Sequence, residues 1–315
     1  MTEKLPGAVG DAQRRALRRS IARRKTWDWL FALGGVLALV LALLVFATLF
    51  GQMLKNGLPH LSWEFVSSFP SRRASSAGIL SAWVGTTLVM LVTAVVAVPL
   101  GVGAGIYLEE YAPKNLLTDI IEINVTNLAG VPSIIYGLLA LGLFVYQFGL
   151  GQSIATAGLT LALLILPVVI VATREAIRTI PQNIREGAYA CGATQWQMVS
   201  QHIIPYSLPG IMTGVIIGLA RAIGETAPII TIGALTFIAF LPPSPLGNSG
   251  HLISFEWLAA PFTVMPIQMF NWISRPEEAF QANAAAAGLV LVVMTLSMNA
   301  VAIGIRYHFR KRIKW

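Results

Sequence analysis

Two opposite charges stand four residues apart in the apolar stretch ARAIGETAPII, residues 220–230: Arg221 and Glu225. On a helix this spacing puts both side chains on one face, within reach of each other. A charge at the centre of a bilayer costs at least about 2.5–3.5 kcal/mol. The guanidinium is a planar fork of donors that fits oxyanions such as phosphate. The pair either neutralises itself or lines a substrate pathway, with Thr226 beside it.

The chain carries no catalytic constellation of its own. No Walker A pattern occurs, and the four histidines are scattered along the sequence. Cys191 is the only cysteine, so an intrachain disulfide and cysteine-based metal spacings are excluded. We therefore expect no catalytic residues, no metal ligands and no cofactor bound to this chain.

The composition is that of a polytopic membrane protein. Of 315 residues, 56% are apolar and 11% are charged, against roughly 25% charged residues in soluble domains. Long uncharged stretches predict an all-α membrane protein with six transmembrane helices. The expected spans are residues 30–50, 79–106, about 120–146, 154–173, 208–238 and 284–305. The expected organisation is a basic N-terminal tail (1–28), a membrane domain (29–308) and a basic C-terminal tail (309–315).

Lys and Arg in the connections set the expected orientation, because cytoplasmic loops carry the excess of positive charge. Seventeen lie in the two tails and in the second and fourth connections, against four on the other side. Both tails are therefore expected in the cytoplasm. Arg221 alone belongs to no connection. We read the basic residues as a topology signal that also attracts anionic lipid, and not as a nucleic-acid site.

The fourth connection, about residues 174–206, is more than a polar linker. Asn183 is a possible N-cap with Glu186 at the third helical position. Gly192 predicts a tight corner between two helices, and Pro205 is expected to end the loop before the fifth span. Such a helical corner can insert into a partner protein. An amphipathic helix lying on the membrane surface is the alternative.

This connection resembles the EAA loop of bacterial binding-protein-dependent ABC importer permeases, with three mild departures: Gly187 for an alanine, His202 at a usually apolar position, and Ile204 for leucine. The resemblance implies a type I importer bundle in which a coupling helix docks on a separate ATPase subunit, where ATP and Mg²⁺ would bind. The matching residues are Glu186, Gly187, Ala188, Gly192, Ile204 and Pro205.

Small residues suggest where helices approach closely. Gly210, Gly214 and Gly218 recur every four residues in the fifth span, which predicts a close helix seam. The glycines at 101, 103 and 105 are likewise interpreted as helix packing. Pro132 should break or kink the third span, which makes Ser133 and Tyr136 candidates for the pathway. Asp119 and Glu122 are interpreted as interfacial residues.

The string from Arg221 to Thr226, followed by Ala227-Pro228, resembles the fifth-span signature of PstA-type phosphate importer permeases, as do residues 68–79, 127–137 and 264–287. The resemblance covers most of the chain from about residue 60. It implies that Arg221 and Glu225 are needed for phosphate passage. It also implies a homologous PstC-like permease, two PstB-like ATPase copies and a periplasmic PstS-like binding protein, in the inner membrane of a bacterium.

We hypothesise that Glu225 contributes to the selection of phosphate over sulfate. Phosphate keeps a proton at neutral pH and sulfate does not, so Glu225 can accept a hydrogen bond from phosphate and repel a fully ionised anion. The competing idea is that Glu225 only restrains Arg221. The alternatives at the level of function are a permease for another oxyanion (sulfate, molybdate or phosphonate), a secondary carrier working without an ATPase, and a scaffold for phosphate signalling.

Overall fold

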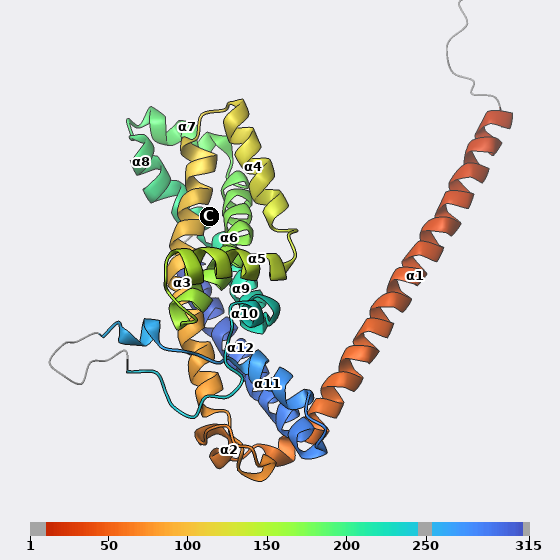
Figure 1. The fold of residues 1–315 in the computed structure, drawn as a ribbon. Coiled ribbons are helices and arrows are strands. Elements are labelled where there is room, and N and C mark those ends of the chain that lie inside the picture. Colours follow the sequence, from red (N-terminus) through yellow and green to blue (C-terminus); the bar gives the residue numbers. More distant parts are fainter. Residues whose placement is uncertain (1–10, 245–253, 311–315) are drawn as a thin grey trace, which may run out of the picture. The chain divides into compact units, whose positions relative to one another are not determined.

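A computed structural model of the chain describes residues 11–244 and 254–310 (Figure 1). The chain divides into two units, residues 1–55 and residues 56–315. The described part of the first unit belongs to helix α1 (Asp11–Gly57). The predicted first span, 30–50, lies inside this helix, whose candidate membrane segment runs from Trp27 to His60. Residues 58–62, which include the 3₁₀ turn η1, connect α1 to α2.

The second unit is helical throughout its regular structure in the described ranges. Its long helices are α3 (Leu80–Ile106), α6 (Ile154–Arg178), α9 (Ile204–Gly224) and α12 (Glu278–Arg310). Its shorter α-helices are α2 (Trp63–Ser67), α4 (Leu116–Leu128), α5 (Ser133–Ala140), α7 (Gln182–Ala190), α8 (Gln195–Met198), α10 (Ala227–Thr231) and α11 (Met265–Ile273). The 3₁₀ turns are η1 (Leu58–His60), η2 (Ala74–Ser76) and η6 (Glu256–Ala259), and the π turns are η3 (Tyr107–Tyr111), η4 (Leu141–Gln147) and η5 (Val199–Ile203).

Within the described residues, five helices are long and apolar enough to cross a membrane, and the bent pair α4–α5 brings the number to six. The expected all-α membrane fold is thus confirmed, and one span differs from its predicted form. The third span, predicted over about 120–146 with a break or kink at Pro132, is two helices bent by 106°, so the predicted break is confirmed. The fifth, predicted over 208–238, runs from Gln195 to Gly224.

Prolines explain both breaks. A proline has no N–H for the carbonyl four residues before it, and its ring clashes with that carbonyl. Pro132 stands four residues after Leu128, where α4 ends, and Pro228 stands four residues after Gly224, where α9 ends. The fifth span was predicted too far because the apolar stretch continues past Gly224, where the helix ends.

Pro205 was expected to end the fourth connection, and this prediction is wrong. The helix continues from α8 through η5 and α9, and Pro205 occupies the first turn of α9. The π turn Val199–Ile203 directly precedes it. A π turn departs from the regular α-helical hydrogen-bond pattern, so this proline follows a stretch in which that pattern is already interrupted.

Close helix seams hold α6 against α3 and α9. A Cβ on Gly214 would overlap the Cβ of Ala172, and one on Gly210 would lie 2.7 Å from the Cβ of Ala176. Gly218 lies at the same seam, where an added Cβ would be 3.5 Å from the Cβ of Ile165. The predicted glycine seam of the fifth span is therefore confirmed, with α6 as its partner.

Glycines also allow α3 to approach α6 closely. A Cβ on Gly101 would lie 2.7 Å from the Val169 side chain, and one on Gly105 would lie 2.6 Å from Thr173. Gly103 has open space around it, so the packing predicted for this third glycine is wrong. Buried leucines and isoleucines fill the space between these helices, among them Leu164 and Ile165 of α6.

The α7–α8 corner, residues 182–198, lies at one end of the second unit, and α2 lies at the other (Figure 1). Gly192 has φ +82, the left-handed conformation that glycine adopts without strain. The predicted corner glycine is therefore confirmed. Asn183 is not the N-cap, because Pro181 takes that place and Asn183 falls inside the helix. The capping box is instead formed by Thr194 and Gln197 at the start of α8.

The corner makes a matched pair of substitutions possible. Gly192→Ala should destabilise the chain by about 1–2 kcal/mol, because an L-residue is strained in the left-handed conformation. Gly187→Ala lies in α7 with nothing within 4 Å of the added Cβ. This control should be neutral or stabilise by up to about 1 kcal/mol. Thermal unfolding of the two variants in detergent measures the difference, and equal shifts would contradict the assigned corner.

Candidate functional site

Arg221 and Glu225 meet at the end of α9. Nε of Arg221 donates to Oε1 of Glu225 at 3.2 Å, so the predicted contact is confirmed. Its geometry differs from the prediction in one respect: Glu225 is extended and lies just outside the helix. The pair therefore spans the break in the backbone, with Arg221 in the last turn of α9 and Glu225 after it.

The ion pair leaves most of the guanidinium available. In residues 11–244 and 254–310, neither Nη1 nor Nη2 of Arg221 has a protein partner, and the side chain is 40% exposed. Glu225 is less exposed, at 19%, and borders a small cavity of about 10 Å³ with Val264, Ile229 and Thr86 on its walls. The Glu225 carboxylate thus borders a mostly apolar cavity, while Nη1 and Nη2 of Arg221 stay available. Such a site can bind an anion through these two terminal nitrogens.

Tyr136 lies in α5, the second helix of the bent α4–α5 pair. Its hydroxyl donates to the Leu128 carbonyl at 2.8 Å, the carbonyl that Pro132 leaves without an α-helical partner. The amide of Val131 also donates to this carbonyl, at 3.1 Å, so the carbonyl is satisfied within the protein, as a membrane requires. Tyr136 thereby links α5 to the end of α4.

Close packing of α5 on α10 fixes this approach. A Cβ on Gly137 would overlap Oγ1 of Thr231 and would lie 2.7 Å from Cα of Pro228. Figure 1 shows α5 and α10 in the middle of the second unit, between its two ends. Ser133 is half-buried at the start of α5, and Thr226 is half-buried at the N-terminus of α10. The structure thus gathers Arg221, Glu225, Tyr136 and Thr226 around two helix breaks.

The residues predicted for ATPase coupling lie elsewhere, at the α7–α8 corner. Glu186 and Gly187 are exposed, while Ala188 packs with Ile177, Met198 and Ile203 in a small apolar cluster. Ile204 and Pro205 begin α9 and are half-buried. Two aromatic side chains add to the exposed surface of the corner: Tyr189 at 47% and Trp196 at 66% exposure.

A network of ion pairs near this end was not predicted. Arg174 is buried and pairs with Glu109 and Glu122, while Arg178 pairs with Glu109 at 2.9 Å. Arg185 pairs with Glu110 at 2.7 Å. These arginines were interpreted only as topology charges, and Glu122 as interfacial. The adjacent acids Glu109 and Glu110 after a long apolar stretch were the available signal.

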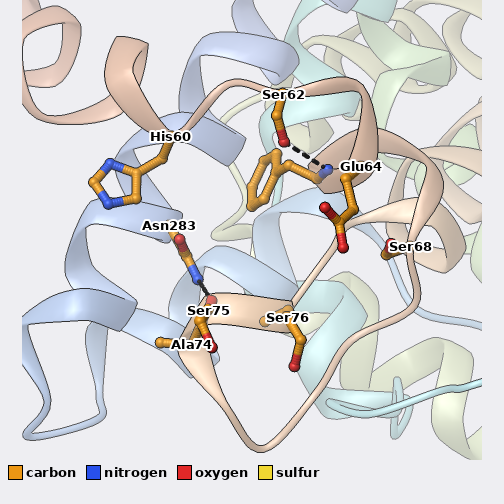
Figure 2. Close-up of a pocket in the computed structure, with 10 residues that line it drawn as sticks. His60, Ser62, Glu64, Ser68, Ala74, Ser75, Ser76 and Asn283 are labelled. Atoms are coloured by element: carbon orange, nitrogen blue, oxygen red, sulfur yellow. Dashed lines mark hydrogen bonds between the residues drawn. The ribbon is translucent and has the colours of Figure 1, made fainter.

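A second, polar pocket lies at the α2 end of the unit (Figure 2). Its volume is about 100 Å³, and Figure 2 shows His60, Glu64, Asn283 and several serines around it. The amide of Asn283 donates to the Ala74 carbonyl, and Ser62 caps α2 by accepting from the Phe65 amide. The carboxylate of Glu64 opposes an anion here, so Arg221 offers the better oxyanion site. Within the described ranges no group of three His, Cys, Asp or Glu side chains could hold a metal ion.

Proteins with similar sequences and structures are permeases with this architecture. Residues 97–315 match the family described as binding-protein-dependent transport system inner membrane component. The probable ABC transporter permease protein YqgI of Bacillus subtilis is 31% identical over 85% of this chain and 90% of its own length. The phosphate transport system permease protein PstA 1 of Mycobacterium tuberculosis is 32% identical over 75% of this chain and 73% of its own.

Among solved structures, a chain of the MetNI methionine ABC transporter in an inward-facing conformation has a TM-score of 0.54 and 17% identity. The match covers 71% of this chain and 93% of that one. At this identity the similarity shows the fold alone, which is that of an ABC importer permease with a type I bundle. The family match covers more than half of the chain, and several relatives are about 30% identical to it. Together these findings establish the family. The chain belongs to the inner-membrane components of binding-protein-dependent transport systems.

Proposed function

We propose that the chain is the PstA-type permease subunit of an ATP-driven phosphate importer in a bacterial cytoplasmic membrane. The observation that carries the proposal is the guanidinium of Arg221 at the break in the fifth span: Nε pairs with Glu225, while Nη1 and Nη2 have no protein partner among the described residues and the side chain is 40% exposed. Relatives named as phosphate transport permeases at 29–32% identity support phosphate as the anion. The chain supplies the pathway and performs no covalent chemistry.

The exposure of Arg221 argues for a second permease subunit. A membrane pathway has to be enclosed by protein on all sides, because a bare charge facing lipid is costly. In this chain 40% of the Arg221 side chain is open. A homologous, PstC-like subunit would close the pathway from that side, so that the ion pair faces the shared interface.

The source of energy lies on other chains in this proposal. The α7–α8 corner would dock on one of two PstB-like ATPase copies, which bind ATP and Mg²⁺. Glu186, Tyr189 and Trp196 offer it exposed polar and aromatic groups. A PstS-like binding protein would deliver phosphate at the opposite end, near α2. Both tails would then lie in the cytoplasm, in agreement with the distribution of Lys and Arg.

In the transport step, Arg221 binds phosphate oxygens through its free nitrogens. Glu225 then either accepts a hydrogen bond from the proton that phosphate retains, or only restrains Arg221 between cycles. The first role would favour phosphate over sulfate, because sulfate presents no proton to the carboxylate and meets an uncompensated negative charge. The extended backbone at Glu225 leaves the carboxylate free to turn from Arg221 to a passing anion.

Arg221→Gln should abolish import. Losing a charged hydrogen-bond donor at a desolvated site costs about 2–5 kcal/mol, so uptake should fall by at least about tenfold. Labelled phosphate delivered by the binding protein into proteoliposomes with the complete complex measures this. Lys114→Gln, which removes an exposed charge between η3 and α4, is the control and should leave uptake unchanged. Import at the wild-type rate by Arg221→Gln would refute the pathway.

Glu225→Gln separates the two roles of the carboxylate. If Glu225 recognises the phosphate proton, the variant should lose discrimination against sulfate while still moving phosphate. Counterflow of labelled phosphate and sulfate through complexes without the binding protein measures selection by the permease itself. Glu225→Asp keeps the carboxylate and is the matched control. An unchanged phosphate-to-sulfate ratio in Glu225→Gln would leave only the restraining role.

The same assays separate the rival functions. A permease for another oxyanion would prefer sulfate, molybdate or phosphonate in counterflow. A secondary carrier would transport without any ATPase subunit. A role in phosphate signalling can coexist with transport, and an Arg221 variant that abolishes uptake and leaves the signal intact would reveal it.

A further inference from the structure

Two adjacent carboxylates on the π turn η3 bind two different elements. Successive residues of a helix point about 100° apart, so neighbours in sequence face different directions. Glu109 faces α6, where its Oε2 accepts from Nε of Arg178 at 2.9 Å. Glu110 faces the α7–α8 corner, where its Oε1 accepts from Nη2 of Arg185 at 2.7 Å.

Glu110 contacts both helices of the corner. Its side chain binds Arg185 of α7, and its backbone carbonyl accepts from Nε2 of Gln195, the first residue of α8, at 2.6 Å. That carbonyl is available because the helix ends at Tyr111, and carbonyls in a last helical turn have no partner within the helix. Ala112 is extended, as expected for a residue that precedes a proline.

The guanidinium of Arg185 contacts three groups: the Glu110 carboxylate and two backbone carbonyls. Besides Glu110, its guanidinium donates to the carbonyl of Ile180 at 2.9 Å and to that of Ile177 at 3.3 Å. The fork thus joins the start of α7 to the C-terminal end of α6 and to η3, which continues α3. A lysine has one compact charge and cannot reproduce this planar arrangement.

The Glu110–Arg185 pair is well placed to transmit force. The Glu110 side chain is 6% exposed and that of Arg185 is 14% exposed, so water screens the pair little. The corner also packs on the bundle through the apolar cluster around Ile177, Met198 and Ile203. Apolar contacts are not directional, so they permit sliding. The ion pair and its hydrogen bonds fix the orientation of the corner on the bundle.

We propose that Glu110 and Arg185 are positioning residues that transmit movement of the α7–α8 corner to the membrane helices α3 and α6. The inference rests on the proposed docking of the corner on an ATPase subunit, and it concerns the connection behind the docking surface. Glu109 has a different task, since it joins η3 to α6 and makes its ion pairs with Arg174 and Arg178. Loss of Glu110 therefore separates ATP hydrolysis from transport.

The native sequence supplies a reporter for the corner. Cys191 is the single cysteine of the chain and is exposed at the C-terminal end of α7. A nitroxide label on Cys191 in the assembled complex reports the mobility of the corner by electron paramagnetic resonance. Glu110→Gln and Arg185→Lys should increase that mobility. Glu175→Gln is the matched control, because Glu175 is an exposed carboxylate that pairs with Arg178 on its own helix.

The unlabelled complex supplies the functional measurement. Phosphate imported per ATP hydrolysed should fall by at least about tenfold in Glu110→Gln, as when one partner of a desolvated charge pair is removed. ATP hydrolysis should persist, because the docking surface itself is unchanged. Glu110→Asp, which keeps the carboxylate, should restore part of the ratio. A purely structural defect would lower hydrolysis and import together and leave their ratio unchanged.

The outcomes distinguish this inference from the proposed function. If the wild-type complex imports phosphate and Glu110→Gln keeps both its label mobility and its phosphate-to-ATP ratio, the inference is wrong. If import and hydrolysis fall in parallel, the pair is structural and the inference is also wrong. If the wild-type complex hydrolyses ATP without importing phosphate, the proposed function fails. Increased mobility in Glu110→Gln and in Arg185→Lys, with a lowered ratio, supports the inference.

Discussion

The contact between Arg221 and Glu225 depends on a helix that stops inside the bundle. Pro228 cannot bond the Gly224 carbonyl, so α9 ends there and the extended Glu225 turns its carboxylate back onto Nε of Arg221. Pro132 ends α4 by the same rule, and the Tyr136 hydroxyl and the Val131 amide both donate to the freed Leu128 carbonyl. Backbone groups at membrane depth must be satisfied by protein, so these breaks are tolerated only where other elements cover them. The close approach of Gly137 to Pro228 and Thr231 packs α5 against α10 next to both breaks.

Charge is distributed in two places with different consequences. At the α9 break a single guanidinium is half-used and open, which suits the transient binding of an anion. Near the α7–α8 corner the arginines are engaged with Glu109, Glu110 and Glu122, which suits a permanent connection between elements. Buried ion pairs add little net stability over apolar packing, but breaking one is costly. The network is therefore better understood as fixing geometry than as stabilising the fold.

Much of the fold follows from the sequence. Apolar length predicts the helices, four-residue glycine spacing predicts the α6–α9 seam, and Pro132 predicts the break of the third span. The end of the fifth span was missed because an uncharged stretch records composition, while Pro228 acts on one backbone bond. The cap at Asn183 was missed because Pro181 already starts the helix. The pairs of Arg178 with Glu109 and of Arg185 with Glu110 join residues about 70 positions apart, and no local pattern encodes such contacts.

In the proposed transport step, a phosphate ion crosses the membrane at the α9 break, bound by the free nitrogens of Arg221. A cryo-electron microscopy structure of the complete complex, trapped during transport with phosphate, would locate that ion. We expect an anion within hydrogen-bond distance of Nη1 or Nη2 of Arg221, next to Glu225 and enclosed by the second permease subunit. An anion bound along a route that avoids Arg221, with the Arg221–Glu225 pair facing lipid, would contradict it.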